Sequence, residues 1–481
     1  MVLSSVRRTS IFVYDQFILQ MKRYFLSVFL IVGLCSISCT EKPDEPEEEV
    51  SPLTPSYSEQ TVTHPEIVSV LKEKGISFDA SGRILLDDKA RSLEFLDLSG
   101  KQIDDYSDLA TLPELSGLKL SDNQYGPVFD MSILPVQITS VDLTGNEIYE
   151  FRNLVEFEEK DGKVQNVKLL HDFSELILPE SAKYDCNELP AYFVHDKEVD
   201  MKLEEEAYST LREVPDLATR FILRSAYPSI FSGLKIDISR RLENQDERIQ
   251  DLVIRKDRIP VGCAADRIGS VEGAEYIIMN PGFLGRRICL DSSEPCTLPY
   301  LKLSSTLYYF ETHKVNTPHL DMLETKYLMG FQAYENDGIE EVDLKQNQIL
   351  GQRTPFAETS PESLSLLELV SCNNLKSVTL PPKAAIIYSL AIEDVPLLKV
   401  LDLSGLEFIV HLSFSYLPEC KISYPCYTES FFRLIGAYFG VTEEFYRKNA
   451  ETREFLDEYH YWMNLGPTQK GEFFDWTQLY S

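Results

Sequence analysis

Apolar residues recur with one fixed spacing between residues 93 and 148. Each copy has an apolar residue, two free positions, a second apolar residue, one free position and a third apolar residue. The copies are Leu93-Leu96-Leu98, Leu115-Leu118-Leu120 and Ile138-Val141-Leu143, and their starts lie 22 and 23 residues apart. In a strand the last two apolar residues point to the same side. The pattern therefore predicts one short strand per copy, with its apolar edge facing a shared core.

A polar residue follows the second and third copies at the same place, Asn123 and Asn146. A buried side-chain amide at this place can bond backbone groups of neighbouring coils that would otherwise be unpaired. We predict that Asn123, Asn146 and Asn347 are structural ladder residues and not ligand contacts, and that Cys372 takes the same place in a later coil.

This combination of spacing and asparagine tail resembles the leucine-rich-repeat family. The resemblance implies an α/β to mostly β solenoid of parallel strands, stacked at about 22–23 residues per coil, with helical caps and a helical insertion. Repeat arrays of this kind present a long strand face. The resemblance therefore favours a binding module over an enzyme, and it implies that Cys372 is a tolerated substitute for asparagine.

Further copies of the spacing continue along the chain, less regularly. They begin at Val164, Ile249, Leu298, Ile339, Leu364, Ile387 and Ile409, and two interleaved copies begin at Leu375 and Leu398. A strand-like stretch every 11 or 12 residues predicts that the C-terminal coils carry a strand on both faces.

The N-terminus contains an export signal. Met21-Lys22-Arg23 precedes an uncharged apolar run from Phe25 to Leu34, and small residues lead to Cys39. The run is too short to span a membrane, which takes about 20 apolar residues, so residues 1–38 are an upstream extension and a signal peptide. The small residues before Cys39 resemble a bacterial lipobox, which implies lipidation of Cys39. The alternative is an ordinary signal peptide with an incidental cysteine.

Residues 39–58 are acidic, rich in proline and poor in apolar side chains. Such a segment cannot bury enough surface to fold, and like charges keep it extended. Acidic residues directly after a lipidated cysteine resemble the signal that sends lipoproteins to the cell surface in some Gram-negative bacteria. We therefore expect a lipid anchor in the outer membrane, on the cell surface, with a periplasmic location as the alternative.

The rest of the chain divides at changes in the repeat pattern. The predicted parts are an N-terminal cap (59–90), repeats (91–178), a largely helical insertion (179–248), repeats (249–419) and a helical C-terminal cap (420–481). A linker between two repeat blocks is the alternative for the insertion, and a partner-binding helical pair is the alternative for the last part.

The formal net charge of −31 argues against nucleic acid, whose phosphates need stripes of Lys and Arg. It also argues against adhesion to anionic lipid, so the membrane link is expected to be the lipid anchor alone. No catalytic or nucleotide-binding motif occurs in the sequence. We expect no enzymatic activity, cofactor or metal site.

The outward residue between the last two apolar positions reads Asp97, Lys119, Asp142 and Lys168 along the first four coils. Alternating charges on adjacent strands pair with one another, which leaves little for a ligand. Partner contacts are therefore expected on the later coils or on the insertion.

Two functions fit the sequence: adhesion to a protein partner, or glycan binding in a nutrient-uptake system. We favour the protein, because the aromatic residues expected to face outward are scattered: Phe95, Tyr300 and Tyr388. A structural envelope protein without a ligand is the third alternative.

Overall fold

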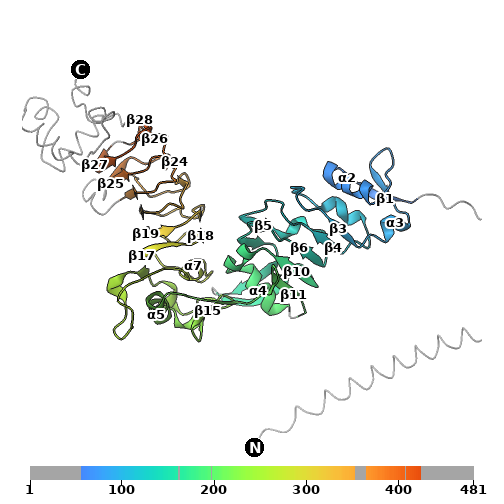
Figure 1. Ribbon diagram of the computed structural model, residues 1–481, viewed down its shortest axis with the longest axis horizontal. Helices are drawn as coiled ribbons and strands as arrows, with labels where there is room; N and C mark the ends of the chain where they lie inside the picture. Colours follow the sequence, from blue (N-terminus) through green and yellow to red (C-terminus); the bar gives the residue numbers. More distant parts are fainter. Residues whose placement is uncertain (1–55, 161–162, 197, 353–364, 407, 424–481) are drawn as a thin grey trace, which may run out of the picture. The chain divides into compact units, whose positions relative to one another are not determined.

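The computed structural model describes residues 56–160, 163–196, 198–352, 365–406 and 408–423 (Figure 1). Cys39, the signal peptide and residues 39–55 of the tether lie outside the described residues. So do residues 424–481, which hold almost all of the predicted C-terminal cap. Among the described residues, no helix has the length and apolar character needed to cross a bilayer.

The first described segment precedes the repeats. Strand β1 (Tyr57–Thr61) pairs antiparallel with β2 (Arg83–Leu85), and helices α2 (Pro65–Glu73) and α3 (Asp88–Arg91) lie before the first parallel strand. Ile67 and Leu71 of α2 are fully buried in the same hydrophobic cluster as the first repeats. A capping role for this segment remains a prediction.

The first repeats form a six-stranded sheet with the order β12-β11-β10-β6-β4-β3 (Figure 1). Its parallel strands are β3 (Phe95–Asp97), β4 (Gly117–Lys119), β6 (Ser140–Asp142), β10 (Glu175–Leu178) and β11 (Asp200–Leu203), and β12 (Glu206–Ala207) adds an antiparallel edge. Leu96, Leu118 and Val141 are register neighbours and are buried. The predicted stack of parallel strands is thus confirmed for the first three copies.

The copy that begins at Val164 does not form the fourth strand of this sheet. Strand β9 (Lys163–Leu169) pairs antiparallel with β8 (Val155–Lys160), and β10 lies beside β6 instead. Lys168 faces Glu156 in this hairpin, with Nζ 3.0 Å from Oε2. In the parallel sheet the register partner of Asp142 on the next strand is Ile177. Lys168 therefore does not belong to the column of outward charges with Asp97, Lys119 and Asp142, and that prediction is wrong. Apolar spacing carries no information about strand direction, which is why the prediction failed here.

Short elements connect the strands of this first array. They are η1 (Ser107–Thr111), β5 (Val128–Asp130), η2 (Met131–Ile133) and β7 (Glu150–Arg152), and β5 pairs in parallel with β7.

Residues 179–248 mix helices and strands. The helical elements are η3 (Glu180–Tyr184), α4 (Glu188–His195), α5 (Leu217–Ala226), η4 (Pro228–Ile230) and α6 (Gln245–Arg248). Strands β13 (Leu211–Arg212), β14 (Phe231–Ser232) and β15 (Lys235–Asp237) form an antiparallel sheet, and β11 continues the first parallel sheet. Two hydrophobic clusters meet here, because Cys186 belongs to one cluster and Leu189 to the other.

The later repeats form a parallel seven-stranded sheet with the order β16-β17-β19-β21-β23-β25-β27 (Figure 1). The strands are β16 (Leu252–Ile254), β17 (Arg287–Thr297), β19 (Tyr309–Asn316), β21 (Gly330–Tyr334), β23 (Leu366–Val370), β25 (Ile386–Glu393) and β27 (Phe408–Ser415). Helices η5 (Lys256–Arg258) and α7 (Glu275–Ile278) lie between β16 and β17 in the chain. The copies that begin at 249, 364, 387 and 409 occupy this sheet.

The opposite side of these coils also carries strands, as the interleaved copies predicted. The parallel pairs are β18 (Tyr300–Lys302) with β20 (His319–Asp321), β22 (Glu341–Asp343) with β24 (Ser377–Thr379), and β26 (Val400–Asp402) with β28 (Lys421–Ser423). The copies that begin at 298 and 339 belong to this second series. Asp343 of β22 and Glu368 of β23 therefore lie in different sheets.

Thr312 occupies a core position of β19 and gives a stability prediction. Its side chain is fully buried, and its hydroxyl has no hydrogen-bond partner among the described residues. Because an unpaired buried hydroxyl is unfavourable, Thr312→Val should raise the free energy of unfolding by about 1–2 kcal/mol. Thr317→Val is the matched control, because that buried hydroxyl lies 3.1 Å from Asn336 Nδ2 and accepts its hydrogen bond. Denaturant unfolding should show opposite signs, and a destabilised Thr312→Val variant would contradict this reading.

Candidate functional site

The outward side of strands β17 to β25 carries an ordered set of polar and aromatic side chains, here called the strand face. Its residues alternate along each strand with buried core residues such as Phe310, Phe331 and Leu367. In register, its three rows are Arg287, Tyr309, Gly330, Leu366, Ser389; then Cys289, Glu311, Gln332, Glu368, Ala391; then Asp291, His313, Tyr334, Val370, Glu393.

The middle row is held by two hydrogen-bonded groups. Arg287 Nη2 lies 3.0 Å from Glu311 Oε2, and His313 Nε2 lies 3.1 Å from Glu311 Oε1. Glu368 accepts from Gln332 Nε2 at 2.7 Å, from Ser389 Oγ at 2.6 Å and from the Tyr334 hydroxyl. The planar ends of these side chains are thus fixed in place by their neighbours.

The charge state of the row follows from these contacts. The hydrogen bond with His313 is the largest effect on Glu311 and, together with Arg287, lowers the pKa of Glu311 to about 2 against the opposing effect of burial. Burial and the Glu368 carboxylate raise the pKa of the Tyr334 hydroxyl. At neutral pH the face therefore presents the Glu311 carboxylate as an acceptor, while the Tyr334 hydroxyl stays protonated and donates to Glu368.

Two ring surfaces flank the middle row. The rings of His313 and Tyr334 are stacked, with centroids 4.4 Å apart and an interplanar angle of 12°. On the other side, Tyr309 lies over Gly330, where an added Cβ would be 2.6 Å from Tyr309 Cδ1. Any side chain at position 330 would displace that ring, so glycine is needed there for close approach. The result is a polar row between two aromatic surfaces.

The first sheet presents a different face. Asp97, Lys119 and Asp142 are register neighbours, and Lys119 Nζ lies 4.0 Å from Asp142 Oδ2. The pKa of Asp97 is lowered, first by the Ser99 hydroxyl and more weakly by Lys119. Phe95 is 50% exposed and lies over Gly117, which makes it an isolated ring surface on this face.

The Lys119 pair gives a second stability prediction. Its side chain is 41% exposed and that of Asp142 is 21% exposed, so solvent screens the pair and its contribution is below about 1 kcal/mol. Lys119→Glu should lower the free energy of unfolding by about that amount. Lys168→Glu is the control outside the column, and denaturant unfolding of both variants measures the difference. A loss of several kcal/mol in Lys119→Glu would contradict this reading, because it would exceed the contribution of a solvent-screened ion pair.

The four predicted ladder residues lie at two kinds of position. Asn123 and Asn146 are buried and bond backbone atoms of neighbouring coils. Asn347 does the same on the side of the coils opposite the seven-stranded sheet, donating to Thr325 O and Leu328 O at 3.1 and 2.9 Å. The Cys372 thiol is buried and lies 3.5 Å from Ala333 O. All four side chains are buried, and their role as ladder residues stays a prediction.

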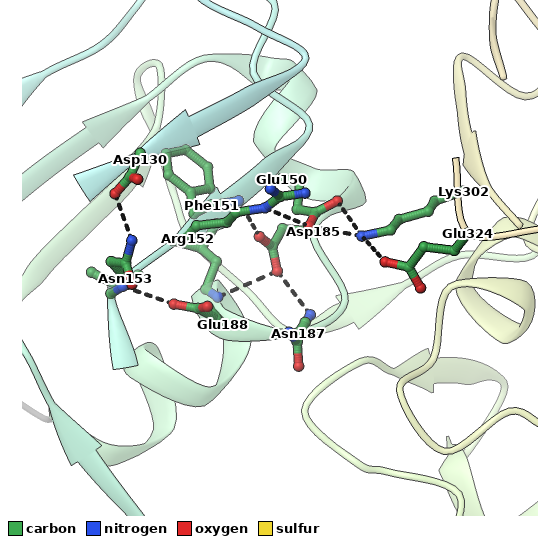
Figure 2. Close-up of polar contacts among 12 residues, drawn as sticks. Asp130, Glu150, Phe151, Arg152, Asn153, Asp185, Asn187, Glu188, Lys302 and Glu324 are labelled. Atoms are coloured by element: carbon green, nitrogen blue, oxygen red, sulfur yellow. Dashed lines mark hydrogen bonds and ion pairs between the residues drawn. The ribbon is translucent and has the colours of Figure 1, made fainter. Parts of the chain in front are cut away.

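A second polar centre lies where the two hydrophobic clusters meet. Figure 2 shows Lys302 of β18 reaching the carboxylate of Glu150 in β7, with Nζ 3.0 Å from both oxygens. The Tyr300 hydroxyl also donates to Glu150, and the Tyr300 ring stacks on Tyr149 at 5.0 Å. These groups line a cavity of about 300 Å³. Lys302 and Tyr300 thus already bond the Glu150 carboxylate, the acidic group of this cavity.

The same region holds a buried carboxyl group. Asp185 accepts hydrogen bonds from the backbone N–H groups of Phe151, Asn187 and Leu189 (Figure 2). Burial nevertheless raises the pKa of Asp185 to about 7. Burial also raises the pKa of Glu275 to about 7.

No metal-binding group emerges from the part of the chain that the structure describes, where no three His, Cys, Asp or Glu side chains are placed to hold an ion. Cys289 and Cys296 both lie in β17 and are thiols. Burial raises the pKa of the Cys289 thiol to about 12, which argues against a nucleophilic role.

The residues of the strand face were missed from the sequence, except for Glu368 and Ala391, which lie between the last two apolar residues of the copies that begin at Leu364 and Ile387. Tyr309, His313 and Tyr334 lie on β19 and β21, whose repeats have Thr312 and Ala333 where a large apolar residue is usual. Tyr300, expected to face outward, is buried against Tyr149. The missed signal was the alternation itself, Tyr-Phe-Glu-Thr-His over 309–313 followed by Gly-Phe-Gln-Ala-Tyr over 330–334.

Comparison with known proteins does not assign the chain to a family. No protein-family model matches the chain, and no curated protein matches it. Among solved structures, the functional domain of InlJ from Listeria monocytogenes, described as including a cysteine ladder, shares 12% identity at a TM-score of 0.17, over 74% of this chain and 69% of that one. A leucine-rich-repeat protein of Leptospira interrogans shares 12% identity at a TM-score of 0.15, over 78% of this chain and 96% of that one. Scores this low establish neither a shared fold nor a shared function.

Proposed function

We propose that this chain is a leucine-rich-repeat lipoprotein of the bacterial cell envelope and acts as a binding module, with the strand face as its binding surface. In this view the stacked coils are a rigid solenoid that presents the face, and the chain performs no catalysis. The observation that carries the proposal is the fixed row Glu311, Gln332 and Glu368, which is flanked by ring surfaces and partly exposed.

The strand face is favoured over the first sheet because of the partners of its charged side chains. The described side chains of the first column pair with each other, as Lys119 does with Asp142, whereas Glu368 is bonded only to neutral donors among the described residues. Parallel strands about 4.8 Å apart hold their outward side chains in a regular array. Such an array gives a ligand preorganised contacts, which reduces the entropy lost on binding.

The envelope anchor rests on Cys39, which follows the small residues at the end of the signal peptide. Cys39→Ala should move the protein from the membrane fraction to the soluble fraction and remove the mass of the lipid. Cell fractionation with mass spectrometry measures both, and Cys35→Ala is the matched control that should change neither. A Cys39→Ala protein that stays in the membrane would contradict the lipoprotein assignment.

The binding role is tested by retention on outer-membrane material from the host cell. Gln332→Arg places a bulky cation in the middle row and should lower retention of the labelled chain at least about tenfold, which corresponds to about 1.4 kcal/mol. Thr379→Arg on β24 is the control, because that strand belongs to the sheet on the opposite side of the coil. Equal retention of the two variants would show that the strand face is not the binding surface.

A protein partner, favoured from the sequence alone, and a glycan are the two candidate ligand classes. The glycan gains support from a specific observation, the clustering of Tyr309, His313 and Tyr334 on adjacent strands.

A further inference from the structure

The strand face combines ring surfaces with planar hydrogen-bonding groups in an alternating order. Tyr309 covers Gly330 on one side, and the stacked pair of His313 and Tyr334 lies on the other. Between them run a carboxylate, an amide and a second carboxylate, from Glu311, Gln332 and Glu368. This order restricts the class of ligand. A ligand that matches the face must have apolar patches and hydroxyl groups at short, alternating intervals.

We infer that the strand face is a saccharide-binding site, and that it takes a neutral oligosaccharide whose sugar rings lie across strands β17 to β23. The inference rests on the proposed binding function and names the ligand of that same face. A pyranose ring has an apolar face of C–H groups, which packs on an aromatic ring, and a rim of hydroxyl groups. Carboxylates accept hydrogen bonds from those hydroxyls, and Arg287 offers donors. Gln332 offers its side-chain carbonyl as a further acceptor, because its Nε2 already donates to Tyr334 and Glu368.

The preorganisation of these groups fits a sugar ligand. Each planar group of the middle row is held by a neighbour: Glu311 by Arg287, and Glu368 by Gln332 and Ser389. A carboxylate that accepts hydrogen bonds from neighbouring donors keeps further lone pairs for a ligand hydroxyl. Orientation is therefore fixed before binding, which limits the entropy lost when a weakly interacting ligand is bound.

A protein ligand fits the same face less well. Binding energy in protein interfaces concentrates on large apolar or aromatic anchors that fill dry pockets. In the three rows of the strand face, the aliphatic side chains larger than alanine are Leu366 and Val370, both partly buried. Neither lies in the middle row. The face therefore offers hydrogen bonds and flat rings, but no cluster of aliphatic anchors.

The charge of the face excludes acidic sugars. Glu311 is ionised and Glu368 has no cationic partner among the described residues, and the whole chain carries a formal net charge of −31. Uronic acids or sulfated sugars would add like charges at short distance. The ligand is therefore expected to be neutral or to carry an amino group.

The test is binding of the purified full-length protein to an array of neutral and uronic-acid oligosaccharides, followed by affinity electrophoresis in the neutral polysaccharide that gives the strongest signal. We expect neutral ligands to bind. Tyr309→Ala and Tyr334→Ala should each weaken binding at least about tenfold, equal to about 1.4 kcal/mol. Tyr327→Ala, which removes a tyrosine that is 42% exposed outside the strand face, is the matched control and should leave binding unchanged.

Tyr334→Phe keeps the ring and removes only the hydroxyl, so it guards against loss of binding through misfolding. We expect it to retain most of the binding, with an unchanged melting temperature. Binding of acidic sugars alone, or neutral binding that survives both alanine variants, would overturn the inference. Absence of any glycan binding, together with Gln332-dependent retention on envelope proteins, would overturn the saccharide ligand and leave the proposed function standing. Absence of both would overturn both.

Discussion

Asn146→Ala should lower the free energy of unfolding by about 3 kcal/mol, near the upper end for loss of one buried polar side chain. Asn146 donates from Nδ2 to Leu120 O at 3.0 Å and Leu143 O at 2.8 Å, and its Oδ1 accepts from Asn123 N at 2.9 Å and Tyr125 N at 3.2 Å. Alanine leaves these four backbone groups without their partner inside the array.

Denaturant unfolding of the purified protein measures this change. Asn166→Ala is the control, because Asn166 is exposed on β9 and its amide reaches Glu158 at 3.3 Å. Its effect should stay within about 0.5 kcal/mol. If Asn146→Ala melts like the wild type but loses its ligand, Asn146 is a ligand contact and the ladder assignment is wrong.

The second large effect is a fall in stability as the pH rises from about 4 to about 7. Asp185 and Glu275 are buried, and burial raises the pKa of each to about 7. In this window the folded protein keeps protons that the unfolded chain has already released. Stability therefore decreases with increasing pH. Since one pKa unit corresponds to 1.36 kcal/mol, the two groups together change the free energy of unfolding by roughly a few kcal/mol.

Two other groups with shifted pKa values, His171 and Glu311, also contribute to the pH dependence of stability. Burial lowers the pKa of His171, so its contribution has the opposite sign and is lost as the pH falls below about 6.5. The lowered pKa of Glu311, about 2, means that the stability contributed by this group is lost only when the pH falls through the region between about 4 and 2. Between pH 5.5 and 8 the two buried acids should therefore dominate.

Thermal melts at pH 5.5 and pH 8 test this expectation. The wild type should melt at the higher temperature at pH 5.5, and Asp185→Asn or Glu275→Gln should each remove part of the difference. Glu205→Gln, at an exposed position in the turn between β11 and β12, should leave it unchanged. A wild-type protein that is more stable at pH 8, with Asp185→Asn following the same curve, would contradict the assignment.

The sequence predicted the stacked strands of the first three copies of the apolar spacing. Leu96, Leu118 and Val141 are register neighbours because each fills the same place in the core. The spacing failed at β17, whose first apolar position is Gly285. A Cβ there would be 2.3 Å from Phe283 Cζ and 2.8 Å from Gln250 O. The packing leaves no room for a side chain, so glycine occupies the position where leucine is usual.

The candidate site was hidden for the same reason. Strands β17, β19 and β21 carry most of it, and their incomplete spacing removed their outward residues from consideration. Asn336 shows a related limit: it is fully buried and accepts from Gly338 N and Ile339 N, yet it follows Ala333 and not a leucine. The antiparallel hairpin of β8 and β9 could not be foreseen either, because hydrogen-bond direction leaves no mark on apolar spacing.

Site-specific photo-crosslinking in living cells tests the binding surface most directly. A photoreactive amino acid is placed at Val370 in the third row of the strand face, at Lys119 on the first sheet, or at Thr379 on the opposite side of the coil. This position leaves the middle row intact. If the strand face is the binding surface, covalent adducts should form from position 370, detected as a mass increase, and none from positions 119 and 379. Adducts from 119 or 379 in the absence of adducts from 370 would show that the partner binds elsewhere.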